Sequence, residues 1–206
     1  MTPIPISLAV EGPLDEQVLR RLIRLTSPAL VPGPCYGKMG RDNLRVNVSR
    51  FNSAAPYKPF VILADLERDN CAPELVREWL PSGAHPNLVF RIAVRMVESW
   101  LLADRAAFAG FLGVSRDLLP LEPDRALDAK LLTVKLARRS RNRLIRADLV
   151  PANQSTSRVG KNYVGRLTEF IQTRWQIEQA RQNSPSLDRA VRALAQFRPN
   201  SSGLAD

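Results

Sequence analysis

The fold class of this chain is decided by the stretch Phe60-Val61-Ile62-Leu63-Ala64 and the acidic cluster that follows it, Asp65-Leu66-Glu67-Arg68-Asp69. An apolar run of this length, rich in β-formers and bounded by turn residues, is typical of a buried strand. The stretch Ile4–Val10 repeats the pattern and is followed by Glu11-Gly12. Because sites in open α/β sheets form at the carboxyl ends of strands, the two acidic clusters are predicted to meet at one edge.

Outward from these two strands, the chain alternates between strand and helix patterns. Helical spacing of apolar residues predicts helices over 14–25, 41–51, 71–80 and 96–111, and a further strand is predicted over 87–94. Prolines and a glycine interrupt residues 28–34, which are predicted to be irregular. The helix over 96–111 is expected in two pieces, with Asp104 capping the second. This alternation predicts an α/β fold with a mostly parallel, Rossmann-like sheet flanked by helices.

The character of the chain changes after Pro123. One basic helix is predicted over 124–146, a polar loop over 150–160 and a helix over 163–181. A last helix is predicted to end at Phe197, with Ser184 or Ser186 as its cap. We therefore expect an α/β core over residues 1–115, a helical cap packed on the core over 116–198, and a disordered tail over 199–206.

Composition narrows the cellular setting. The chain has 206 residues, enough for one domain or one domain with a small appendage. No apolar run approaches the roughly 18 residues of a membrane span, so none is expected, and the segment Met1-Thr2-Pro3 is not expected to act as a secretory signal. Its two cysteines, Cys35 and Cys71, do not form a disulfide framework, and with the single His85 they do not have zinc-site spacing. A reduced, cytoplasmic setting is expected.

Charge indicates the class of partner. The 30 Lys and Arg residues outnumber the 20 Asp and Glu residues, giving a net charge of +10. Nucleic acid is the expected polyanion, and an ordinary basic proteome is the alternative explanation. The segment 135–146 is the most basic part of the chain, and on one helix Lys135, Arg138, Arg139 and Arg146 are predicted to form a stripe suited to phosphates. A solvated helix face and a docking surface for an acidic ATPase are the alternatives.

The predicted nucleic-acid contacts include two lysines outside that segment. Lys38 lies between Gly37 and Gly40, but the spacing does not fit a Walker phosphate loop. Lys130 is a second candidate, and Lys161 is a similar one. The full set predicted to contact nucleic acid is Lys38, Lys130, Lys135, Arg138, Arg139, Arg141, Arg143 and Arg146.

The acidic residues suit a divalent cation. Side chains two apart on an extended strand point to the same side, so Asp65 and Glu67 are expected to act together. Mg²⁺ prefers one or two carboxylates with water and phosphate oxygens, and Glu11 would complete such a site or act as a general acid or base. Asp69 and Glu98 are candidates for a second metal. The alternatives are that Asp69 caps the helix near Cys71 and that Glu67 pairs with Arg68 on the surface.

Two motifs carry a resemblance to a known family. The stretch from Glu11-Gly12 into the following helix resembles the opening motif of Toprim domains, and Asp65-Leu66-Glu67 resembles their Asp-x-Asp motif. The segments Val97–Asp104 and Ser184–Leu187 resemble a family of small bacterial Toprim-like proteins of unassigned activity. That family is related to the overcoming-lysogenization-defect nucleases, is often encoded beside AAA/ABC-type ATPases and is suspected in phage defence.

The resemblance implies a Toprim-like fold and a Mg²⁺- or Mn²⁺-dependent nuclease that hydrolyses DNA with an ATPase partner in anti-phage defence. It implies that Glu11, Asp65 and Glu67 are the catalytic and metal-binding residues, and the position of Asp69 and Glu98 makes them candidates for a second metal. RNA is the alternative substrate, and the oligomeric state is left open. Glu67 stands where the family has Asp, and this departure motivates the alternative of a non-catalytic regulatory subunit that binds an ATPase or nucleic acid.

Overall fold

The structure of the chain is a computed structural model that describes residues 3–200. The chain divides into two compact units, which we call the sheet unit (Met1–Ala93 and Arg189–Asp206) and the helical unit (Val94–Asp188). This division differs from the boundary expected at residue 115. The reason lies in helix α4 (Val97–Ala103), whose contacts are with helices of the helical unit.

The sheet unit is built on four parallel strands in the order β2-β1-β3-β4. The strands are β1 (Ile4–Val10), β2 (Leu30–Gly37), β3 (Phe60–Asp65) and β4 (Leu88–Ala93). The predicted α/β class, the parallel sheet and three predicted strands are confirmed. The chain leaves β1 towards β2 on one side and leaves β3 towards β4 on the other. The neighbouring strands β1 and β3 therefore flank a topological switch point, where open α/β sheets form their binding crevice.

Strand β2 was not predicted from the sequence, because Pro32 and Pro34 lie within it. Proline lacks the N–H that a central strand must donate, but an edge strand tolerates it. β2 pairs with β1 alone, and the register shifts between Ile6 and Leu8, opposite the second proline. Gly37 closes the strand with a φ of +84°, and a Cβ there would lie 2.3 Å from the Val10 carbonyl oxygen.

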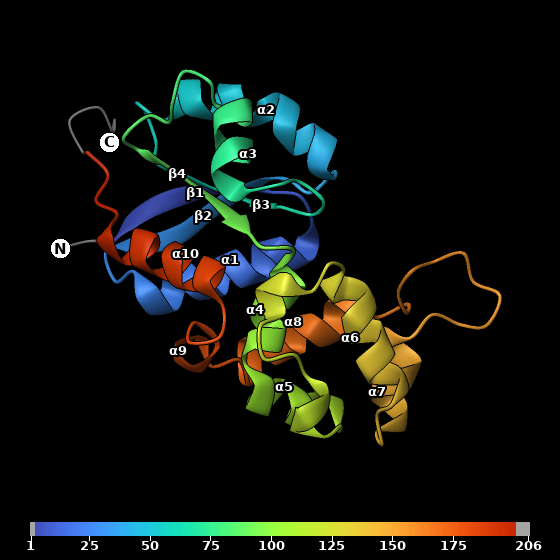
Figure 1. The fold of residues 1–206 in the computed structure, drawn as a ribbon. Helices are drawn as coiled ribbons and strands as arrows, with labels where there is room; N and C mark the ends of the chain where they lie inside the picture. The colour runs from blue at the N-terminus through green and yellow to red at the C-terminus, as the bar shows by residue number, and fades with distance from the viewer. Residues whose placement is uncertain (1–2, 201–206) are drawn as a thin grey trace. The chain divides into compact units, whose positions relative to one another are not determined.

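Helices cover both faces of the sheet. Figure 1 shows α2 (Arg41–Ala54) and α3 (Ala72–Trp79) over one face, and α1 (Pro13–Thr26) with α10 (Pro185–Gln196) over the other. The end of α1 is joined to α10 because Ser27 Oγ donates to the Leu194 carbonyl oxygen at 2.8 Å. The four residues Val18, Leu19, Leu22 and Ile23 form the buried stripe of α1, as their helical spacing predicts.

The helical unit is organised around α4, in which every residue is buried. A helix that is buried on all sides forms the centre of its unit. The other α-helices in the described part of this unit are α5 (Arg105–Leu112), α6 (Ala129–Arg138), α7 (Arg143–Leu149), α8 (Tyr163–Thr173), α9 (Ile177–Ala180) and the first turn of α10, with two short 3₁₀ helices at Arg116–Leu118 and Pro123–Arg125. Trp100 is fully buried in the core of this unit, and its Nε1 donates to Ser186 Oγ at 2.7 Å.

Asp104 caps α5, as predicted. One carboxylate oxygen accepts from the Ala107 N–H at 3.3 Å and the other from the Gln176 N–H at 2.7 Å. The predicted cap of the last helix is also present, because Ser184 Oγ accepts from the Leu187 N–H at 3.2 Å. Both side chains satisfy amide groups that a helix start leaves without an internal partner.

Two segments that were predicted as single helices each form two helices. The basic helix over 124–146 is two helices, α6 and α7, because the chain turns at Ser140 and Asn142 caps α7 by accepting from the Leu144 N–H at 2.9 Å. The helix over 163–181 divides into α8 and α9. The disordered tail predicted over 199–206 begins too early, since Asn200 N–H donates to Asn87 Oδ1 at 2.7 Å. Residues 201–206 of that tail lie outside the described residues.

Candidate functional site

The carboxyl ends of β1 and β3 bring Glu11 and Asp65 together. The Asp65 N–H donates to Glu11 Oε1 at 2.9 Å. The two strands are hydrogen-bonded neighbours, with Val10 beside Leu63, so the residues that end them must lie side by side. Asp65 is 9% exposed and Glu11 is half-buried. The backbone of Asp65 therefore holds the Glu11 carboxylate at the switch point of the sheet.

Glu67 does not lie on the extended strand, where the alternation of side chains was expected to place it on the same side as Asp65. β3 ends at Asp65, and Glu67 has a left-handed φ of +50° in the turn that follows. The predicted pairing of Asp65 and Glu67 on one side of an extended strand is wrong in its geometry, because period-two alternation needs extended backbone. Glu67 remains half-buried at the same end of the strand, and its role stays a prediction.

Asp69 is held by an arginine that the sequence did not single out. Arg41, the first residue of α2, forms an ion pair with Asp69 and donates through Nη1 to the Asp65 carbonyl oxygen at 2.5 Å. Its guanidinium also lies 5.1 Å from the centre of the Trp79 ring. Arg41 thus ties the end of β3 to the turn after it. The predicted cap of α3 by Asp69 is not formed, since Cys71 occupies the cap position.

Lys38 forms an ion pair with the Glu16 carboxylate. Its Nζ lies 3.1 Å from Glu16 Oε2, and Arg20 Nε lies 2.9 Å from the other oxygen of Glu16. Burial favours a higher pKa for Glu16, but the hydrogen bonds from Lys38 and Arg20 outweigh it and lower the pKa below its ordinary value. The charge of Lys38 is therefore largely compensated within the protein, which weakens the case for a phosphate contact.

Glu98 belongs to the helical unit and is 1% exposed. Tyr163 Oη donates to Glu98 Oε1 at 3.2 Å, and Lys130 Nζ lies 3.8 Å from the same oxygen. Glu98 Oε2 is buried without a hydrogen-bond partner among the described residues. Burial raises the pKa of the Glu98 carboxyl, and the Lys130 ammonium opposes that rise. Lys130, predicted to contact nucleic acid, is thus paired with this buried carboxylate.

The predicted basic stripe does not form, because Arg138 ends α6 and Arg143 begins α7. Lys135, Arg139 and Arg141 are exposed on different elements: α6, the residue after it and the turn before α7. Four cations line one pocket: Arg138, Arg143, Arg146 and Lys161, of which Lys161 lies outside the basic segment 135–146. The turn at Ser140 brings arginines of α6 and α7 to the same pocket, and the loop that follows α7 adds Lys161.

The acidic residues of the sheet edge offer few ligands for the predicted cation. Across residues 3–200, no three His, Cys, Asp or Glu side chains are gathered closely enough to enclose a metal ion. Glu11 and Asp65 still fit the two-carboxylate requirement of Mg²⁺, which takes its remaining ligands from water and phosphate oxygens. The five predicted ligands, Glu11, Asp65, Glu67, Asp69 and Glu98, therefore remain predictions, with Glu11 and Asp65 best supported by position.

No family model, curated protein or solved structure matches the chain. The Toprim resemblance and the roles that it implies accordingly stay predictions. Among the described helices, none has both the length and the apolar character needed to cross a bilayer.

Proposed function

We propose that this chain is a metal-dependent phosphodiesterase that cleaves nucleic acid at the carboxyl edge of the sheet unit. The observation that carries the proposal is the hydrogen bond from the Asp65 N–H to Glu11 Oε1 at 2.9 Å. It holds two acidic residues at the switch point, where α/β folds bind their ligands. The net charge of +10 supports a polyanionic substrate.

Each residue has a proposed part in the chemistry. Glu11 and Asp65 would hold Mg²⁺ or Mn²⁺, which when bound supplies positive charge for the phosphate and acidifies water. Glu11, oriented by the Asp65 N–H, would take or return a proton at the reacting oxygen. Arg41 donates to the Asp65 carbonyl oxygen at 2.5 Å and so fixes the strand end that carries the carboxylate. It acts as a positioning residue.

A plasmid-nicking assay tests the proposal. Supercoiled DNA is incubated with the protein and Mg²⁺ or Mn²⁺, and the relaxed product is measured for wild type, Glu11→Gln and Asp65→Asn. The control is Glu74→Gln, which removes one exposed carboxylate from the first turn of α3. We expect the two edge variants to lose nicking and the control to retain it. Nicking that persists in both edge variants would overturn the proposal, because it would come from another site or a contaminant.

A second candidate is a non-catalytic subunit that binds nucleic acid or an ATPase. It is favoured by the ion pair between Arg41 and Asp69, which compensates one predicted ligand, and by the left-handed turn at Glu67. Only the resemblance to the Toprim-like family suggests the ATPase partner and the anti-phage role. Nucleic-acid binding without cleavage, unchanged by Asp65→Asn and insensitive to Mn²⁺, would select this candidate.

A further inference from the structure

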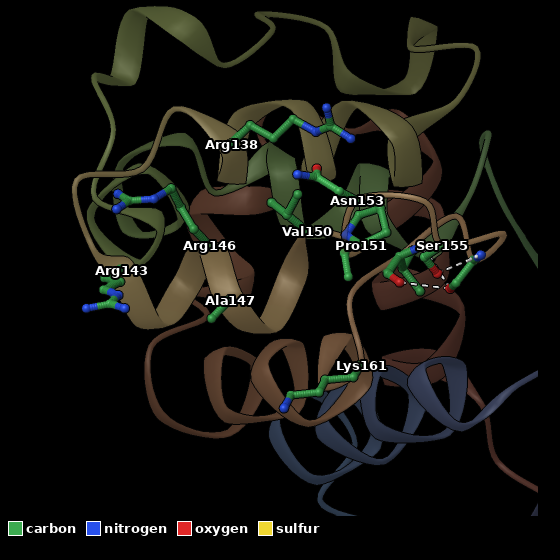
Figure 2. A pocket seen from close by; sticks show the side chains of 12 residues that line it. Arg138, Arg143, Arg146, Ala147, Val150, Pro151, Asn153, Ser155 and Lys161 are labelled. Carbon is green, nitrogen blue, oxygen red and sulfur yellow. Dashed lines mark hydrogen bonds between the residues drawn. The ribbon is translucent and has the colours of Figure 1, made fainter.

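The helical unit contains a basic pocket that the carboxylate chemistry does not use. Its volume is about 740 Å³, within the range of roughly 300–1,000 Å³ that small-ligand sites occupy. Figure 2 shows the side chains that line it, drawn from α6, α7 and the loop that follows α7. The polar lining includes Arg138, Arg143, Arg146, Lys161, Asn153 and Ser155.

The cations of this pocket are not compensated by the protein. Within residues 3–200, none of the four forms an ion pair with a carboxylate. Two acidic side chains that neighbour the lining segments pair with other arginines: Asp148 in α7 pairs with Arg166 at 2.6 Å, and Asp128 before α6 pairs with Arg158. Four like charges around one hollow repel each other, so an anion bound among them would lower the electrostatic energy.

The pocket wall is held in place before any ligand binds. The Gly160 N–H donates to the Leu149 carbonyl oxygen at 3.0 Å, and the Asn162 N–H donates to the Asp148 carbonyl oxygen at 3.2 Å. A Cβ at Gly160 would lie 2.2 Å from the Asp148 oxygen, so the loop approaches α7 as closely as only glycine permits. Arg146 is itself anchored by donating to the Ser140 carbonyl oxygen. A preformed site loses less free energy in ordering itself around a ligand.

The lining indicates the chemical class of the ligand. Val150, Pro151 and Val159 give it an apolar portion beside the amide of Asn153 and the hydroxyl of Ser155. Cations with small polar groups suit phosphates and sugars, and the apolar portion suits the face of an unpaired base. No aromatic side chain is among the lining residues, so the stacking platform of sequence-tolerant single-strand binders is missing. Phosphate contacts would therefore supply most of the affinity.

We propose that this pocket binds the phosphodiester backbone of single-stranded nucleic acid, with little preference for base sequence. The inference rests on the proposed function for the identity of the polymer, since that function makes nucleic acid the substrate. It goes further in naming the strand state and the residues that grip it. Binding needs no metal, so it can be measured apart from cleavage.

Fluorescence anisotropy of a labelled single strand of about 12 thymidines, with EDTA present, tests the pocket. Each lost phosphate contact should lower the salt slope by about 0.7, which is about fivefold in affinity at about 0.1 M salt. The double variant Arg143→Ala/Lys161→Ala removes two exposed cations without breaking any hydrogen bond of the described chain. We expect it to bind about 25-fold more weakly, with a slope smaller by about 1.4.

The matched control is Arg24→Ala/Arg77→Ala, which removes the same charge from exposed positions of the sheet unit that do not line the pocket. We expect a change of no more than about twofold per residue, as long-range charge is screened. Equal losses from both double variants would overturn the pocket in favour of a diffuse basic surface. Equal affinity for thymidine monophosphate and for the 12-mer would overturn a backbone site, leaving a site for small anions.

Strand binding and cleavage can be lost separately, so the two proposals are tested independently. Glu11→Gln and Asp65→Asn should bind the strand as wild type does while losing cleavage. Intact cleavage in Arg143→Ala/Lys161→Ala, with unchanged affinity, would overturn the pocket and leave the carboxyl edge standing.

Discussion

Glu11 has two proposed roles: it accepts a hydrogen bond from the end of β3, and it is a charged catalytic group. Comparing Glu11→Gln with Glu11→Ala separates them. In Glu11→Gln the side-chain amide oxygen still accepts from the Asp65 N–H, which lies 2.9 Å from the native carboxylate oxygen. In Glu11→Ala the acceptor is gone. The two variants share the loss of charge and differ in the hydrogen bond, so their comparison isolates each contribution.

The expected magnitudes follow from that contact. A hydrogen bond to a charged group contributes about 1.5–3 kcal/mol to the free energy of unfolding, and a neutral one about 0.5–1.5 kcal/mol. Glu11→Ala also leaves the N–H of Asp65, a residue only 9% exposed, without this acceptor. We expect Glu11→Ala to lower the free energy of unfolding by about 2–3 kcal/mol and Glu11→Gln by about 1 kcal/mol. The nicking rate should fall by about 10²-fold or more in both, because an acid–base group contributes about 10²–10⁴.

Urea denaturation followed by circular dichroism measures the stability, and plasmid nicking measures the activity, with Glu74→Gln as the surface control. If Glu11→Gln nicks at the wild-type rate, Glu11 has no catalytic role and only holds the strand end. If Glu11→Ala is as stable as Glu11→Gln, the hydrogen bond to the Asp65 N–H contributes nothing to stability.

Three further predictions concern groups whose environment the structure defines. Burial raises the pKa of the Cys35 thiol to about 11, so iodoacetamide labelling of the Cys71→Ser variant should keep accelerating up to about that pH; a plateau near the ordinary thiol pKa contradicts this. Asp104→Ala leaves the Ala107 and Gln176 amides without their acceptor and should lower the free energy of unfolding in urea by about 2–4 kcal/mol, whereas Asp104→Asn, which retains an acceptor, should lose less than half of that. Burial raises the pKa of Glu98, so its contribution to stability is present below the unfolded pKa of about 4.3 and is lost as pH rises. The stability of Glu98→Gln relative to wild type should therefore increase from pH about 4 to about 8, and a pH-independent difference contradicts this.

The sheet unit was largely predictable because its signals are local. Buried apolar runs give β1 and β3 directly, and helical spacing gives α1. β2 could not be predicted, because Pro32 and Pro34 normally interrupt a strand. An edge strand tolerates them, but the edge position of β2 is set by the order of strands in the folded sheet and not by the local sequence. The break between α6 and α7 had one local signal, Asn142 as a helix cap, which the run of positive charge obscured.

The candidate site was predictable only in part. The contact of Glu11 with Asp65 follows from two strand ends at one edge, which the motif order indicated. The ion pair of Arg41 with Asp69 joins residues from different elements, and nothing in the local pattern of Arg41 indicates it. The basic pocket likewise depends on a loop folding back to bring Lys161 into the lining that holds Arg138. Such contacts are set by tertiary packing rather than by periodicity.

Binding of Mn²⁺ shows, independently of any substrate, whether Glu11 and Asp65 form one divalent-cation site. Electron paramagnetic resonance measures free Mn²⁺ as protein is titrated. We expect wild type and Glu74→Gln to bind the ion, and Asp65→Asn and Glu11→Gln to bind it at least tenfold more weakly. Binding by Asp65→Asn as tight as that of wild type, or no binding by wild type, would contradict this expectation.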